Sequence, residues 1–424
     1  MIRTHIIPCN LPKTAGDALN MASGRIYSQV CVYHWRTYRK KGVWLSQYTA
    51  MKVNDFFRRG LNYLHAHTVD AAQEGFYKAC KTTREARKAG VEDIKFPHKR
   101  KRFRTTIWKN TAIGCSGGIL VLSNGRGNRQ IEIKLPKYLR NVLRFLEVRL
   151  VYEKKAGKYF WHIVVENGRQ AKGAPGNNVL SVDLGEVHPA VVGDEQEAVI
   201  ITCRELRYAK QGHNKRLAQL NEAISRTRKG SRKRGRLVRA RTRLKAKHKL
   251  VVRDMEHKIS KSIVDIALER QAETIALGDV RDAANGIAMS KQSNQKISQW
   301  SHGKIRKYVE YKADAEGMRV VQVNESYTTQ TCPNCTERHK PKGRVYRCPA
   351  CRFQSHRDVV GQVNILSVYK YGEPGKIPVP PVIKHRIPHN LRVMRRRRDT
   401  GQGSLSQRIS PVACRFLQEA ASLQ

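Results

Sequence analysis

The chain has 424 residues, and its 82 Lys and Arg against 34 Asp and Glu give a formal net charge of +48. Charge of this size destabilises a compact fold by self-repulsion unless a polyanion neutralises it, so nucleic acid is the expected partner. An anionic membrane surface or a ribosomal role is the less specific alternative. Because 40% of the residues are hydrophobic, the chain can build two or three domains, which excludes a disordered basic tail.

The sequence shows no signal for secretion or membrane insertion. No apolar run approaches the roughly 18 residues that a membrane helix needs, and Met1–Ala15 lacks the apolar region of a secretory signal. Four of the ten cysteines form two close pairs and the others are scattered singly, unlike a short disulfide scaffold. We expect an intracellular protein in a reducing compartment, without a membrane partner.

The first part of the chain is predicted to change from helices to strands. Residues 16–95 carry apolar and aromatic residues at helical spacing, and we assign most of them to a helical core. Residues 96–177 are predicted to form strands, including a hairpin with the arms Arg149–Tyr152 and Tyr159–Val165. The loop composition of Gly173–Asn178 marks a domain boundary.

The next elements predict an RNase H-like sheet. An apolar run that starts at Val179 ends at Asp183, and two more short strands follow it. Further along we predict a helical hairpin (206–270), a strand (274–279), a helix (304–317), a strand (319–325) and a short helix (358–369). Residues 371–424 are rich in Pro and Arg, and we expect them to be disordered or ordered only on nucleic acid.

Two basic stretches are candidates for phosphate contacts. Between Arg226 and Lys249, 13 of 24 residues are Lys or Arg and none is acidic. Without acids for pairing along the helix, such a run repels itself unless phosphates lie against it. The candidate nucleic-acid contacts are Lys99, Arg100, Lys101, Arg102, Arg228, Lys229, Arg232, Lys233, Arg234 and Arg236.

Four cysteines have the spacing of a metal site. Cys332 and Cys335 form one C-x-x-C pair, and Cys348 and Cys351 form a second pair after twelve intervening residues. Two such turns complete a tetrahedral shell of four thiolates, which favours zinc over harder ions. Since all four positions are filled by protein, we predict a structural zinc ribbon.

Two acids stand where a two-metal phosphodiesterase needs them. Such an enzyme holds two Mg²⁺ ions with carboxylate oxygens. In an RNase H-like core, the carboxylates come from the end of the first strand, a central strand and the last helix. Asp183 fits the first position and Asp358, at the start of the final helix, fits the third.

The motifs and their order resemble those of the TnpB proteins of insertion sequences, which are related to compact type V CRISPR effectors and to Fanzor proteins. The motifs are Val182–His188, Tyr327–Cys335, Tyr346–Cys351 and His356–Leu366, and the resemblance covers about residues 178–370. It implies a multidomain α/β fold: an RNase H-like (RuvC) nuclease core with an inserted zinc ribbon, plus N-terminal helical recognition and β-barrel-like wedge domains.

The resemblance also implies domain limits. They are a wedge strand (1–15), a helical recognition domain (16–95), a wedge β domain (96–177), a RuvC-like core (178–325) with the basic hairpin (206–270), a zinc ribbon (326–355), a last RuvC-like helix (356–370) and a basic tail (371–424).

The middle acid departs from the family pattern, because Gly278 stands where a Glu is expected at the end of the central strand. Three interpretations compete. The nuclease is inactive; or Asp279 substitutes, although strand alternation would direct it to the other face; or Glu325 supplies the acid from the neighbouring strand, about 4.8 Å away. The third arrangement is similar to a branch of TnpB and Fanzor proteins with a relocated middle acid. We take Asp183, Glu325 and Asp358 as the Mg²⁺-binding catalytic set, with Asp279 as the alternative.

The resemblance implies an RNA-guided, Mg²⁺-dependent DNA endonuclease of a transposable element. Its partners would be a guide RNA and a target DNA, which it cuts beside a short flanking motif, and we favour a monomer. The alternatives are a nuclease-dead RNA-guided repressor and a zinc-ribbon DNA transposase that acts without RNA.

Overall fold

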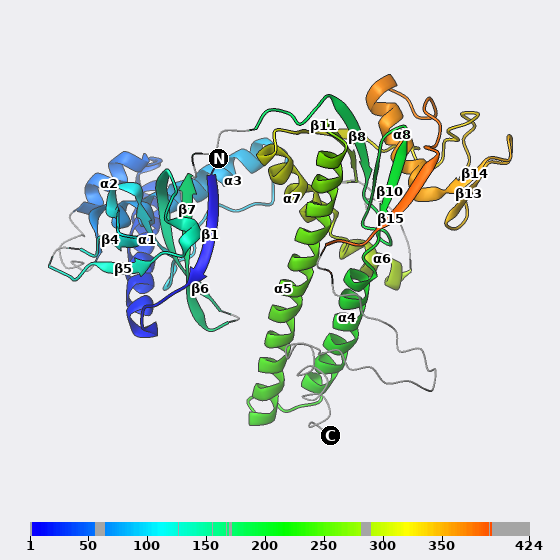
Figure 1. Cartoon of the computed structure of the whole chain (residues 1–424). Helices are drawn as coiled ribbons and strands as arrows, with labels where there is room; N and C mark the ends of the chain where they lie inside the picture. Colours follow the sequence, from blue (N-terminus) through cyan, green and yellow to red (C-terminus); the bar gives the residue numbers. More distant parts are fainter. Residues whose placement is uncertain are drawn as a thin grey trace, which may run out of the picture. The chain divides into compact units, whose positions relative to one another are not determined.

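The computed structural model describes residues 2–55, 64–125, 127–154, 156–166, 168, 172–280, 290–389 and 391, and shows a mixed α/β chain (Figure 1). Strand pairing in this part forms sheets of four, six, two and three strands. Of the helices it contains, none has both the length and the apolar character that a membrane span requires.

The helices predicted for residues 16–95 are present. They are α1 (Lys13–Lys41), α2 (Gln47–Asp55) and α3 (Ala66–Lys88). Tyr27 and Phe76 are almost fully buried in an aromatic core between α1 and α3. Their rings pack edge to face, with centroids 6.0 Å apart. Between α2, which ends at Asp55, and α3, residues 56–63 lie outside the described part.

The strands predicted for the next region form two sheets. They are β1 (Ile2–Pro8), β2 (Thr106–Lys109), β3 (Ile113–Ser116), β4 (Ile119–Leu122), β5 (Ile131–Lys134), β6 (Arg144–Glu153) and β7 (Lys158–Glu166). The orders are β1-β7-β6-β2 and β3-β4-β5, and the predicted hairpin is β6–β7, with Tyr152 opposite Tyr159. Residues of both sheets, such as Trp161 of β7 and Leu120 of β4, pack in one hydrophobic core. The barrel-like form that we expected for this domain stays a prediction.

The second half of the chain contains the helical hairpin, the six-stranded sheet and a small two-stranded sheet. Its elements are β8 (Asn178–Asp183), β9 (Ala190–Gly193), β10 (Glu197–Ile201), α4 (Arg204–Ser225), α5 (Arg232–Glu269), β11 (Ala272–Asp279), α6 (Lys291–Ser298), α7 (His302–Ala315), β12 (Arg319–Asn324), β13 (Val345–Arg347), β14 (Gln354–His356), α8 (Arg357–Tyr371) and β15 (Val382–Arg386).

The six-stranded sheet has the order β12-β11-β8-β9-β10-β15. Strands β8, β9 and β10 form an antiparallel meander, whereas β8, β11 and β12 run parallel. This is the arrangement predicted for an RNase H-like core. Helix α8 packs on the sheet: Val359 contacts residues of β9 and β10, and Ile365 contacts Ala276 of β11 and Val323 of β12. The packing fixes the start of α8 against the ends of the parallel strands.

The prediction of disorder from residue 371 onward is wrong for its first part. Strand β15 pairs in parallel with β10, and Ile377, only 2% exposed, packs against Val363 and Leu366 of α8. The prolines and basic residues of this segment suggested disorder, but its interspersed apolar residues cover the otherwise open edge of β10. The prediction for residue 390 and residues 392–424 lies outside the described residues.

Candidate active site and metal centre

Asp183, Glu325 and Asp358 come from three elements that meet at one edge of the six-stranded sheet. Asp183 is the last residue of β8, Glu325 directly follows β12, and Asp358 lies in the first turn of α8. Because β8, β11 and β12 are parallel, their carboxyl ends lie at the same edge. In open α/β sheets this edge is where ligands bind.

The carboxylate of Glu325 lies over Gly278, near the end of β11. A Cβ atom at position 278 would come within 1.7 Å of Oε1 and 2.5 Å of Cδ of Glu325. Atoms cannot approach so closely, so the Glu325 carboxylate fills the space that any side chain at position 278 would need. The glycine therefore allows Glu325 to fold back over the central strand.

A second glycine makes room for Asp183. A Cβ atom at Gly361, in the second turn of α8, would lie 2.5 Å from Oδ2 of Asp183. Gly361 was not among the site residues predicted from the sequence. A glycine within an otherwise apolar helical run was the available signal, because such a glycine usually has a packing or functional reason.

Burial and neighbouring acids raise the pKa values of Asp183 and Glu325. Burial, together with the charge of Asp358, raises the pKa of Asp183 to about 7. Burial, with the charges of Asp183 and Asp279, raises the pKa of Glu325 to about 9. Asp358 is partly neutralised by Arg344, whose Nη1 lies 3.2 Å from Oδ2. The acids thus interact through space, and the cluster favours a bound cation.

One atom of this cluster is unsatisfied: Oε1 of Glu325 is buried and has no hydrogen-bond partner. A buried carboxylate oxygen in that state is unfavourable unless it is protonated or coordinates a cation. Carboxylate oxygens are the ligands that Mg²⁺ prefers, so the donor set fits the predicted ion. Asp279 is also close, since its charge acts on Glu325.

Two imidazoles that we did not predict lie beside Asp358. His188, His356 and Asp358 each offer a ligand atom, and these atoms lie within 4.8 Å of one another. Nδ1 of His356 accepts a hydrogen bond from the backbone N–H of Asp358 and so caps α8, whereas Nδ1 of His188 is buried without a partner. No pattern in the sequence joins His188 to the other two residues, because only the fold brings them together.

The four cysteines converge on one point. Their Sγ atoms lie within 4.8 Å of one another, with Cys332 and Cys351 separated by 3.7 Å and Cys335 and Cys348 by 3.5 Å. A tetrahedron with Zn–S bonds of about 2.3 Å has S···S edges of about 3.8 Å, so the sulfurs fit zinc. Contacts from the Asn334 side chain and the Phe353 backbone N–H lower the pKa of Cys351 to about 6, which favours the thiolate.

The cysteine centre packs directly on the core. Cys332, Cys348 and Tyr346 form a buried cluster with Val360 of α8. The hairpin β13–β14 carries Tyr346 and leads into α8. The segment that holds the cysteines is thus attached to the helix that carries Asp358.

The predicted phosphate contacts are mostly exposed. The exposed members are Lys99, Arg100, Lys101, Arg102, Arg228, Lys229, Arg232, Lys233 and Arg236. Arg234 differs, because its Nη1 donates to the backbone carbonyls of Ile224 and Thr227 and so closes the turn between α4 and α5. The remaining side chains are available to bind a polyanion.

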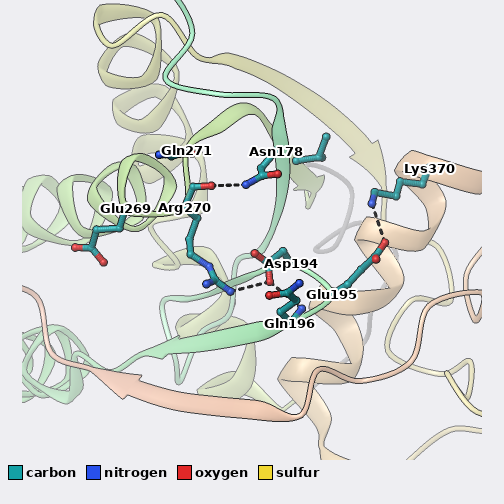
Figure 2. Close-up of a pocket in the computed structure, with 9 residues that line it drawn as sticks. Asn178, Asp194, Glu195, Gln196, Glu269, Arg270, Gln271 and Lys370 are labelled. Atoms are coloured by element: carbon teal, nitrogen blue, oxygen red, sulfur yellow. Dashed lines mark hydrogen bonds and ion pairs between the residues drawn. The ribbon is translucent and has the colours of Figure 1, made fainter.

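A polar pocket of about 340 Å³ lies at the other end of the sheet (Figure 2). Its charged groups already pair: Arg270 with Asp194 at 3.0 Å, and Lys370 with Glu195 at 2.7 Å. Asn178, at the start of β8, donates to the carbonyl of Arg270. These contacts tie α5 and α8 to the sheet, and we assign the pocket a structural role.

Comparisons with known proteins agree with the geometry. The model "Probable transposase" matches residues 162–284, and the model "Cas12f1-like, TNB domain" matches residues 302–365. The TnpB-like protein MJ0751 of Methanocaldococcus jannaschii is 29% identical over 193 residues, which cover 45% of this chain and 68% of that protein. The sequence is thus similar to TnpB-like proteins.

Further likeness extends to a CRISPR-associated protein. The endodeoxyribonuclease Cas12f1 of Sulfoacidibacillus thermotolerans is 19% identical over 227 residues. The aligned part covers 51% of this chain and 52%, about half, of that relative. The structure of a Cas12f1–sgRNA–target DNA complex superposes with a TM-score of 0.57 at 11% identity, covering 84% of this chain and 83% of the other. That similarity shows that the folds are alike.

The cysteine centre predicts a measurable zinc content. We expect the purified full-length protein to contain about one zinc ion per chain. Cys348→Ser is expected to lose the metal and to unfold at a lower temperature, because the centre packs on α8. Zinc analysis and thermal unfolding test this, with Cys115→Ser, an exposed cysteine outside the cluster, as the control. Equal zinc in the Cys348→Ser variant would contradict the site.

Repulsion within the acid cluster predicts stabilising amide variants. Since the pKa values of Asp183 and Glu325 are raised, ionisation destabilises the fold, and stability is lost as the pH rises through about 7 and then about 9. At pH 9, without added divalent cations, Asp183→Asn and Glu325→Gln should each raise the midpoint of thermal unfolding by about 2–4 °C. Asp254→Asn, an exposed acid, should leave it unchanged. A lower midpoint in both amide variants would show that the acids do not repel each other.

Proposed function

We propose that this chain is an RNA-guided, Mg²⁺-dependent DNA endonuclease of a transposable element, which cuts target DNA matched by its guide beside a short flanking motif. One observation carries the proposal: Asp183, Glu325 and Asp358 lie at the edge of the parallel strands, with a buried carboxylate oxygen left without a partner. Similarity to TnpB-like proteins and the named activity of Cas12f1, an endodeoxyribonuclease, support it.

Glu325 is our choice for the middle acid. Its carboxylate occupies the space above Gly278, where the family pattern places a glutamate side chain. It also interacts with Asp183, which interacts in turn with Asp358. This supports relocation of the acid from β11 to the end of β12 over substitution by Asp279. It also argues against an inactive nuclease, because a chain that had lost its middle acid would have no need to hold a buried carboxylate here.

The three carboxylates would hold the Mg²⁺ ions, together with His188 or His356 where these reach the same ion. When bound, two such ions activate a water molecule and stabilise the leaving oxygen of a phosphodiester. The protein's own residues orient the acids: Gly278 and Gly361 provide space, and Arg344 pairs with Asp358. The zinc of the ribbon would be structural, since four thiolates leave no open position.

The basic surfaces would bind the nucleic acids. We assign the exposed residues of the α4–α5 turn to the guide RNA or the guide–target duplex, and Lys99–Arg102 to phosphates near the flanking motif. The solved Cas12f1 complex, which holds an sgRNA and a target DNA, supports these partners. We propose that the chain acts inside the cell.

A DNA transposase is the second candidate, because the model that matches residues 162–284 bears that description. It would join DNA ends without RNA. A nuclease-dead repressor would retain RNA and target binding without cutting.

The decisive test is to express the chain with its flanking DNA, sequence the RNA that copurifies, and assay cleavage of a matching DNA target with Mg²⁺. We expect guide-dependent cleavage, lost by at least about 100-fold in Asp183→Asn and Glu325→Gln, because metal-ion catalysis contributes several kcal/mol. Absence of bound RNA, with DNA binding unchanged by ribonuclease, would favour the transposase. Bound RNA without cleavage would indicate the repressor.

A side chain at position 278 and the Glu325 carboxylate cannot occupy the same space. This conflict provides a sharper test of the middle acid. Gly278→Ala should displace the Glu325 carboxylate and reduce cleavage, whereas Gly212→Ala, whose Cβ would meet no atom within 4 Å, should not. The double variant Gly278→Glu with Glu325→Gly moves the acid to β11 and should cut faster than Gly278→Glu alone. If the double variant is no better, and Asp279→Asn abolishes cutting, then Asp279 is the middle acid.

A further inference from the structure

The turn that joins β12 to the first zinc cysteine holds a tyrosine in an unfavourable conformation. Tyr327 has φ 63°, in the left-handed region, although it carries a bulky side chain. Glycine adopts this region without steric penalty, and asparagine tolerates it better than most residues. A tyrosine there is an outlier that calls for an explanation.

Hydrogen bonds impose this conformation. The backbone N–H groups of Gln330 and Thr331 both donate to the carbonyl of Tyr327, at 2.9 and 3.0 Å. Asn364, fully buried in α8, donates its side-chain amide to the carbonyls of Thr328 at 2.7 Å and Thr331 at 2.8 Å. The turn is therefore fixed to the core, and position 327 keeps its φ value whatever residue occupies it.

The tyrosine ring contributes little to the fold in return. Tyr327 is 50% exposed and belongs to no buried cluster among the described residues. A strained residue whose side chain is half in solvent is not explained by packing. The ring is more simply explained by a ligand outside the protein.

One face of the ring is covered by a cation. The guanidinium carbon of Arg338 lies 3.7 Å from the centroid of the Tyr327 ring. Arg338 is held by a bridge to Thr331 and lies next to Glu337, whose carbonyl accepts from the backbone N–H of Cys332. The segment with the cysteines thus positions the arginine, and half of the Tyr327 surface stays accessible to a further planar group.

The backbone of Tyr327 also lies close to that of the proposed catalytic acid Glu325. Tyr327 is two residues from Glu325, so their Cα atoms are at most about 7 Å apart. The same turn carries Thr329, whose methyl group would be 3.2 Å from a Cβ at Gly361, where Asp183 also approaches. A strand with a phosphodiester at the acids would pass beside this ring.

We propose that Tyr327, backed by Arg338, is a stacking site for an unpaired nucleobase of the DNA strand at the acid cluster. Bases stack on aromatic side chains without regard to sequence, and an arginine nearby adds cation–π attraction and attracts phosphate. The net charge of +48 favours a nucleic acid over other planar ligands. The identity of the strand as a cleavage substrate rests on the proposed function; the stacking contact itself does not.

Binding can be measured apart from cutting. The probe is a single-stranded DNA 12-mer with one 2-aminopurine, moved along the strand through a series of oligonucleotides. The protein is the full-length chain with Asp183→Asn, which prevents cutting without a chelator that would remove zinc. We expect 2-aminopurine fluorescence to be quenched at one or two positions. Quenching should persist in Tyr327→Phe and Tyr327→Trp and disappear in Tyr327→Asn, with affinity reduced about tenfold.

Tyr327→Asn separates stacking from a structural role. Since asparagine suits φ 63°, this variant should unfold at the same temperature as the parent or higher, while losing the fluorescence signal. Tyr371→Asn, which removes an equally exposed ring at the far end of α8, should change neither. A lower unfolding temperature in Tyr327→Asn, with quenching unchanged, would show that the ring is structural and overturn the proposal.

The cleavage assay then distinguishes the two hypotheses. With Asp183 restored, Tyr327→Asn should raise KM for the strand about tenfold and leave kcat nearly unchanged. If the chain cuts no DNA but the quenching pattern is found, the nuclease proposal fails and the stacking site stands. If Tyr327→Asn cuts with an unchanged KM and its Asp183→Asn form quenches the probe normally, the stacking site fails and the nuclease stands.

Discussion

Two carboxyl groups that repel each other, those of Asp183 and Glu325, are held together at the carboxyl edge of the sheet, and much of the core serves this arrangement. The parallel strands β8 and β12 lie on either side of β11 and direct both acids to one edge. Gly278 and Gly361 remove the side chains that would push the acids apart. Burial then raises the pKa of both groups, which makes the empty site unfavourable and a divalent cation favourable.

The segment with the four cysteines is joined to the same edge. Val360 of α8 packs in the cysteine cluster, Arg344 pairs with Asp358, and Asn364 holds the turn before Cys332. Helix α8 therefore contacts the sheet with one side and the cysteine segment with another. A metal ion held by the cysteines would therefore be linked to the position of Asp358 through contacts on one helix.

Much of this could be predicted from the sequence, because the informative signals are local. An apolar run that ends in an acid placed Asp183, two C-x-x-C pairs placed the cysteines, and a glycine at an expected acid directed attention to Glu325. The residues that were missed depend on contacts far apart in the chain. Gly361 matters only because α8 crosses Asp183, and His188 approaches His356 only in the folded core.

The tail and the turn show two further limits of local signals. β15 was missed because the prolines on either side of it and its own basic residues outweigh a short apolar pattern, and only the open edge of β10 gives that pattern a partner. The residue types around Tyr327 do not indicate a left-handed backbone, since the turn that contains it is held partly by Asn364 from another element. A sequence pattern reflects the conformational preference of its own segment, whereas the conformation at these positions depends on contacts with other elements.

The clash between position 278 and Glu325 has a consequence for how such a site changes over time. A chain with glutamate at both positions would crowd two carboxylates into one volume. If Glu325 supplies the third acid as proposed, a chain with glutamate at neither position would lack that acid. A change from one arrangement to the other by single substitutions would then pass through a defective form, and the pair of residues 278 and 325 would be a durable marker of descent.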